Sequence, residues 1–154
     1  MLTIAMILST VSVVAFAETE DTAAVLLSEI ESVLSSEEIT VTEDGLVSEI
    51  NTDETVSISE TITLADGAVV YAPNLTASFT SEAGATVTVN APNASLTAGG
   101  DLTFAGTNAL KSFSASYYNN TINIGADASL EITGTGRVTI GWGNTFNITG
   151  MNML

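Results

Sequence analysis

The last part of the chain is built from a unit of eight residues that repeats without a gap. Four successive octads begin at Thr121, Ser129, Arg137 and Thr145. Each octad has large apolar residues at its second and fourth positions. These pairs are Ile122/Ile124, Leu130/Ile132, Val138/Ile140 and Phe146/Ile148. Because residues i and i+2 of a strand share a face, each octad predicts a half-buried strand of about four residues followed by a turn.

The same unit recurs upstream with slips of one or two residues, so the repeat spans residues 53–154. The equivalent apolar pairs are Val56/Ile58, Ile62/Leu64, Val87/Val89 and Leu102/Phe104. One such unit cannot bury its apolar face alone, so neighbouring units must complete each other's core. We therefore predict an all-β fold, a short parallel β-helix (β-solenoid). Three octads would form a coil of about 24 residues, and about four coils would stack at about 4.8 Å per coil.

Short strands with compact turns can also form an antiparallel β-sandwich, which is the alternative fold. Local self-similarity and a nearly fixed interval between turns favour the solenoid. The direction in which the strands pair distinguishes the two folds.

Residues 1–17 are an uncharged apolar run that ends in Ala15-Phe16-Ala17, directly before the acidic Glu18. This pattern is typical of a secretory signal peptide that is cleaved after Ala17. A membrane-spanning helix needs about 20 apolar residues, and this run is shorter. We therefore expect a secreted or cell-surface protein with no membrane insertion after signal cleavage.

Residues 18–52 are expected to form an acidic leader that contains a short amphipathic helix. Between residues 22 and 35, apolar residues recur at helical spacing. They are Leu26, Ile30, Val33 and Leu34. The apolar stripe of this helix would cap the first rung of the solenoid, whose open edge otherwise invites aggregation. A flexible acidic segment is the alternative.

Charge and composition exclude several functions. The chain has 18 acidic and two basic residues, a net charge of −16, and neither His nor Cys. Residues 1–60 hold 13 of the acids and no base. A field of this sign repels phosphate groups, so no nucleic-acid partner is expected. Without His and Cys, the chain cannot form a Ser-His-Asp triad, a thiol nucleophile or a metal site based on these residues.

Carboxylates are the remaining acid–base groups, and polysaccharide hydrolases use them in pairs. The candidates are Asp101, Asp127 and Glu131, with Arg137 available to hold an acidic sugar. We interpret the three acids as solvated surface groups and predict no catalytic residue. The segment Gly99–Leu102 faintly resembles a calcium-binding glycine-rich loop. Its Asp does not recur in successive units, so we predict no metal site and no cofactor.

Carbohydrate binding requires exposed aromatic faces beside polar side chains. Trp142 lies between two glycines at a turn position of its octad. Tyr117, Tyr118 and Asn119 form a second group of aromatic and amide side chains. These four residues are the predicted carbohydrate-binding site. A Trp142 side chain folded over the end of the solenoid as a cap is the competing interpretation.

Two phrases of the repeat region are LADGAVVYAPN (residues 64–74) and ASLTAGGDLTFAG (residues 94–106). The chain also has the predicted signal peptide and few Lys and Arg residues. Over residues 53–154 it resembles the β-helical stalk and passenger regions of large prokaryotic secreted surface proteins and adhesins. The resemblance implies a structural or adhesive role without catalysis, with host or environmental glycans or other surface proteins as partners.

Two alternatives to the adhesive role are an extracellular carbohydrate-binding module and a fragment of a polysaccharide-degrading β-helix enzyme. Because the pattern stops within a unit at residues 152–154, a truncated reading frame or a fragment is also expected.

Overall fold

The computed structural model describes residues 28, 30, 32–115 and 118–148. The predicted signal peptide and residues 149–154 lie outside the described residues. The strands are β1 (Ile39–Val41), β2 (Val47–Asn51), β3 (Ser57–Tyr71), β4 (Thr76–Ser81), β5 (Ala85–Thr97), β6 (Leu102–Phe104), β7 (Thr107–Ala115), β8 (Thr121–Ile124), β9 (Ser129–Ile132), β10 (Val138–Ile140) and β11 (Thr145–Ile148).

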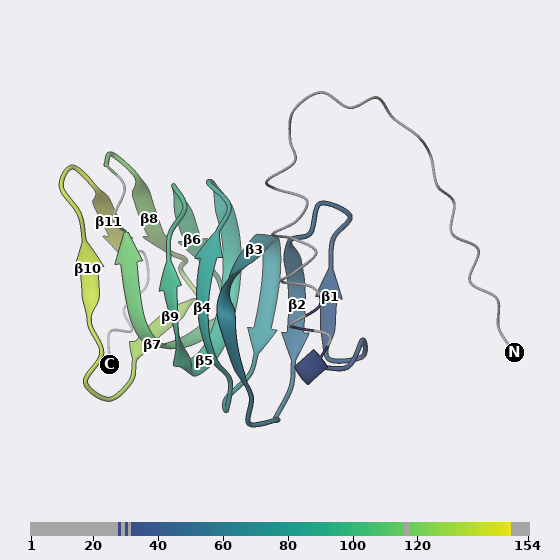
Figure 1. Ribbon diagram of the computed structural model, residues 1–154. Coiled ribbons are helices and arrows are strands. Elements are labelled where there is room, and N and C mark those ends of the chain that lie inside the picture. Colours follow the sequence, from purple (N-terminus) through teal and green to yellow (C-terminus); the bar gives the residue numbers. More distant parts are fainter. Residues whose placement is uncertain (1–27, 29, 31, 116–117, 149–154) are drawn as a thin grey trace, which may run out of the picture.

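The strands stack side by side along one axis, from β1 at one end to β10 and β11 at the other (Figure 1). Strands β2 to β11 each pair in parallel with strands of one or both neighbouring coils. Among the described residues only β1 and β2 pair antiparallel. An antiparallel sandwich lacks such parallel ladders, so the predicted β-solenoid is confirmed and the sandwich is excluded.

A column of inward-pointing apolar residues shows how many times the chain winds. The column consists of Ile62, Phe79, Leu96, Phe113 and Val138, each in register with the next. The first four members are 0–1% exposed. The chain therefore completes four turns between Ile62 and Val138, which confirms the predicted stack of about four coils.

The length of a coil differs from the prediction in the interior of the stack. Successive residues of this column are 17 residues apart as far as Phe113, and 25 residues apart at the last step. The predicted 24-residue coil occurs only at the end, where Thr121 pairs with Thr145. Upstream the octads merge. Strand β5 runs on from Ala85 to Thr97, with inward residues at alternate positions on either side of Pro92-Asn93, so no turn of four residues separates its two faces.

Two corners of the stack are tied by asparagines that follow prolines. The side-chain Nδ2 of Asn74 donates to the Asp53 carbonyl at 2.9 Å, and that of Asn93 donates to the Pro73 carbonyl at 3.0 Å. Each bond joins one coil to the preceding coil. The repeated Pro-Asn dipeptide therefore marks the same corner in two successive coils.

Asn108 is a polar residue in the core, only 1% exposed. Its Oδ1 accepts the Val89 N–H at 2.6 Å. Its Nδ2 donates to the carbonyls of Ala105, Gly106 and Ser129 at 3.0, 3.2 and 2.9 Å. Because every polar atom of its side chain has a partner, the amide joins three adjacent coils without the cost of an unsatisfied buried group.

The segment before the repeats contributes more to the fold than the sequence indicates. Ser28, Ile30, Ser32 and Val33 have helical backbone, which fits the predicted helix over its described part. Ile30 and Leu34 are buried in the core cluster, but Val33 is 38% exposed, and Leu26 lies outside the described residues. Strands β1 and β2 also fall within the predicted leader, and β2 pairs in parallel with β3. The sheet therefore includes residues 39–51.

No helix within the described part of the chain is long and apolar enough to span a membrane.

Candidate functional site

The predicted aromatic site lies at one corner of the last two coils. Trp142 is 87% exposed and Tyr118 is 73% exposed. Asn119 is also exposed and has a positive φ of 61°, a left-handed turn conformation that Asn tolerates well. Tyr117 lies outside the described residues. The exposure of Trp142 contradicts its interpretation as a cap folded over the end of the stack, and the carbohydrate-binding site remains a prediction.

Hydrogen bonds hold the turn of Trp142 against the turn of Asn119. The side chain of Asn144 accepts the Asn120 N–H at 2.8 Å and donates to the Ala115 carbonyl at 2.7 Å. A Cβ atom on Gly143, which has a φ of 76°, would lie 2.7 Å from the Asn119 Oδ1. Glycine suits this position because of its positive φ, and a side chain there would also displace the Asn119 amide oxygen. We refer to Tyr118, Asn119 and Trp142 as the aromatic corner.

An open hollow of 640 Å³ lies beside the aromatic corner. Its lining residues are Ala83, Gly84, Gly99, Gly100, Asp101, Tyr118 and Asn120. Tyr118 offers an aromatic face, and Asn120 and Asp101 offer amide and carboxylate groups. This combination can pack against a sugar ring and hydrogen-bond its hydroxyls.

The structure gives the candidate acids a different setting from a catalytic pair. Asp101 Oδ1 accepts the Thr121 N–H at 2.6 Å, as Asp66 Oδ1 accepts the Thr86 N–H at 2.8 Å. Both acids thus tie their own coil to the backbone of a strand in the next coil. Asp127 and Glu131 are exposed and line neither of the two cavities described here. No pairing of the three acids follows from this arrangement.

The glycines before Asp101 have a structural explanation. A Cβ atom on Gly99 would lie 2.0 Å from the Ser81 carbonyl oxygen, and one on Gly100 would lie 2.6 Å from the Ala83 Cβ. The two glycines let adjacent coils make close contact. In the described residues no group of three or more acidic side chains is placed to hold a metal ion.

A face of hydroxyl groups, which the sequence analysis missed, runs along the outside of β3, β4, β5, β7 and β10. Two columns in register form it: Thr61, Ser78, Ser95 and Ser112, and Thr63, Thr80, Thr97, Ser114 and Thr139. All of these residues are exposed or half-buried. Members of each column are about 4.8 Å apart, and the columns are about 6.7 Å apart, from strand geometry. We call this surface the hydroxyl face.

Hydrogen bonds along the columns fix parts of the hydroxyl face. Ser112 Oγ donates to Ser95 Oγ at 2.8 Å, and Thr80 Oγ1 donates to the Thr97 carbonyl at 3.1 Å. The sequence signal was a Ser or Thr on each side of an inward apolar residue, repeated every 17 residues. The octad interpretation did not predict these columns, because a period of eight does not align residues that are 17 positions apart.

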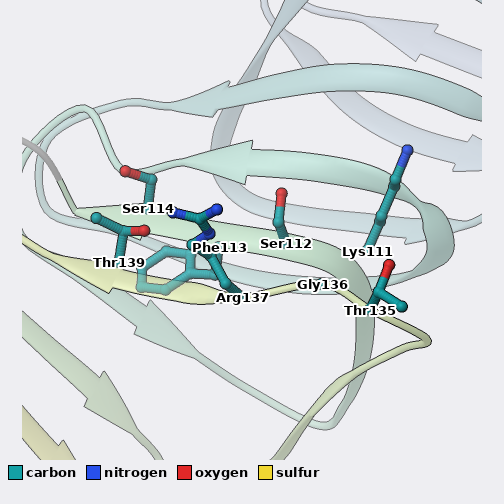
Figure 2. Close-up of a pocket in the computed structure, with 8 residues that line it drawn as sticks. All are labelled: Lys111, Ser112, Phe113, Ser114, Thr135, Gly136, Arg137 and Thr139. Carbon is teal, nitrogen blue, oxygen red and sulfur yellow. The ribbon is translucent and has the colours of Figure 1, made fainter.

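Both basic residues of the chain border a groove at the last rung of the hydroxyl face. This groove has a volume of 360 Å³. Its lining residues are Lys111, Ser112, Phe113, Ser114, Thr135, Gly136, Arg137 and Thr139. Figure 2 shows Lys111, Ser112 and Arg137 projecting from the same side of the strands. We call it the cationic groove.

Comparison with family models, with curated proteins and with solved structures gave no match for this chain.

Proposed function

We propose that this protein is a secreted or cell-surface β-solenoid with a structural or adhesive role, which binds other surfaces and catalyses no reaction. The hydroxyl face is the observation that carries the proposal. The hydroxyl face depends on the regularity of the stack, because parallel strands in register align its Ser and Thr side chains into columns.

A face of this kind suits contact with a polysaccharide. Hydroxyls both donate and accept hydrogen bonds, as the hydroxyls of sugars do. Most of the side chains stand on interior strands that are held by ladders on both sides, so binding orders few groups and loses little conformational entropy. Export supports the same function, because the predicted signal peptide would place the protein where polysaccharides and other surface proteins are available.

The experiment measures retention of the chain, residues 18–154, on a panel of immobilised neutral and acidic polysaccharides. Thr61→Tyr combined with Ser78→Tyr places two bulky rings on exposed, directly paired positions of the hydroxyl face. We expect retention to fall about tenfold, because the rings hold a flat ligand away from the columns.

Thr86→Tyr combined with Thr103→Tyr is the matched control, since this pair is also in register but lies on a different face. It should retain the ligand as the unmodified chain does. Failure of the unmodified chain to bind any member of the panel, or equal losses in the two double variants, would contradict the adhesive proposal.

A second candidate function, a carbohydrate-binding module, is favoured by the 87% exposure of Trp142 beside Asn119. Binding to a glycan array should then be lost in Trp142→Ala. Tyr71→Ala, which removes another exposed aromatic ring from a strand at a distance in the stack, should leave it unchanged. If both variants bind as the unmodified chain does, the aromatic corner is not the binding site.

A further inference from the structure

The chain's only two basic residues converge on one groove. Lys111 and Arg137 are 26 positions apart in the sequence, yet both line the cationic groove. The other residues of the groove add four hydroxyls and the buried Phe113, and no acid is among the eight lining residues.

The fold holds the two bases in place through the main chain. The Phe113 N–H donates to the Arg137 carbonyl at 3.0 Å, which fixes the strand of Arg137 beside that of Lys111. A Cβ atom on Gly136 would lie 1.6 Å from the Lys111 carbonyl oxygen, so only glycine lets the chain cross at this point. Below the groove, the Phe113 ring packs edge-on against Phe104, with centroids 5.2 Å apart. The groove floor is therefore part of the core.

The acidic character of the chain does not prevent an anion from binding here. Residues 1–60 hold 13 acids and no base. The described ones among these acids fall within residues 37–60, the part of the chain around β1, β2 and the start of β3, which lies toward the β1 end of the stack (Figure 1). The cationic groove lies on β7 and β10, three rungs beyond β3 along the hydroxyl face. At physiological salt, exposed charges are screened over about 8 Å, which is less than three rungs of about 4.8 Å.

We propose that the cationic groove binds the anionic group, a carboxylate or a sulfate, of an acidic polysaccharide. Arg137 supplies a planar guanidinium that can donate two parallel hydrogen bonds to such a group, and Lys111 supplies a second positive charge. The polysaccharide chain then continues over the hydroxyl face, whose columns end at Ser112 and Thr139 in the groove. This inference rests on the adhesive function and names the class of its partner.

The experiment compares binding of the chain, residues 18–154, to dextran, dextran sulfate and polygalacturonate. Dextran is the neutral counterpart of dextran sulfate, and polygalacturonate tests a carboxylate. We expect binding to at least one of the two acidic polymers. That binding should weaken about tenfold in Lys111→Gln combined with Arg137→Gln, and should weaken similarly in about 1 M salt, where the screening length is about 3 Å.

The control variant carries the same change in net charge without touching the groove. Thr86→Glu combined with Thr103→Glu also lowers the net charge by two, but on another face of the stack. It should bind acidic polymers nearly as well as the unmodified chain. Thermal unfolding of all variants checks that the fold is intact, which we expect because Lys111 and Arg137 are exposed.

The possible failures separate this inference from the adhesive function. If the chain binds neutral polysaccharides but neither acidic polymer, or if the double Gln variant binds acidic polymers at full strength, the cationic groove is not an anion site and adhesion stands. Equal weakening by the Gln and Glu variants would show that net charge alone governs binding, and would also overturn the inference. If no polysaccharide binds, both proposals fail.

Discussion

The two ends of the stack differ in how their apolar residues are covered. At the β1 end, the antiparallel strand β1 lies beside β2, and Ile30 and Leu34 from the helical segment are 1% and 2% exposed. At the other end, within the described residues, β10 pairs only with β7 and β11 only with β8. There Val138 is 45% exposed and Ile140 is 36% exposed.

This difference teaches that a regular repeat and a buried core are separate properties. The four gapless octads, which are the clearest pattern in the sequence, include the most exposed strand of the solenoid. The interior coils, where the octads slip and merge, contain the fully buried Phe79, Phe104 and Phe113. A residue in a solenoid is buried by the coils on both sides of it, and not by its own place in the repeat.

The largest expected effect comes from truncating two residues of one column, one in the interior of the stack and one at its open end. Phe113→Ala should lower the free energy of unfolding by about 4 kcal/mol, because it leaves a cavity beneath a fully covered rung. Val138→Ala, at the next rung of the same column, should cost at most about 1 kcal/mol, since the side chain is already 45% exposed. Chemical denaturation measures both values. Equal costs would show that the last rung is covered as well as the interior.

A smaller effect is expected at the covered end, where neighbouring residues differ in burial. Leu34→Ala should cost about 2 kcal/mol, because Leu34 is 2% exposed and packs in the core cluster. Val33→Ala is the control and should cost at most about 0.5 kcal/mol, because Val33 is 38% exposed. Thermal unfolding of the two variants gives the comparison. If Leu34→Ala has no greater effect than its control, the helical segment does not stabilise the first rung.

The smallest effect concerns Glu38, which joins the helical segment to the first coil. Hydrogen bonds from the Thr52 hydroxyl and then from the Ser35 N–H and hydroxyl hold the pKa of Glu38 below its ordinary value of 4.5. A lowered pKa in the folded state adds stability above the unfolded value, and this stability is lost as the pH falls through the folded value.

Glu38→Gln should therefore lower the Tm slightly at pH 7, and the difference from the unmodified chain should shrink as the pH falls below 4.5. Glu37→Gln, at the adjacent exposed position, is the matched control and should leave the Tm unchanged. A Tm difference for Glu38→Gln that is the same at low and neutral pH would contradict the role of the ionised carboxylate.

The inward residues of the fold could be predicted from the sequence because alternation fixes which face a strand residue joins. Ile122, Ile62 and Leu102, all placed inward by the octads, are 0–1% exposed. The buried Asn108 could not be predicted in this way. Its four hydrogen bonds reach Val89, the 105–106 turn and Ser129, and these partners meet only after the coils have stacked.

The two candidate surfaces also differ in whether the sequence predicted them. Trp142 stood out in the sequence because a large aromatic residue between two glycines in a turn has few core positions available to it. The sequence did not predict the cationic groove, because nothing in the repeat pattern places Lys111 next to Arg137. Their approach depends on the register of Phe113 with Val138 and on the close crossing at Gly136.

The sequence by itself determined that this protein is a stack of short strands, because each unit pairs two apolar positions on one face and cannot bury them alone. Only the tertiary structure decided the length of each coil, which residues align into the hydroxyl face, and where the two bases meet. Those features depend on contacts between coils, and the local alternation of residues leaves the register of one coil on the next undetermined.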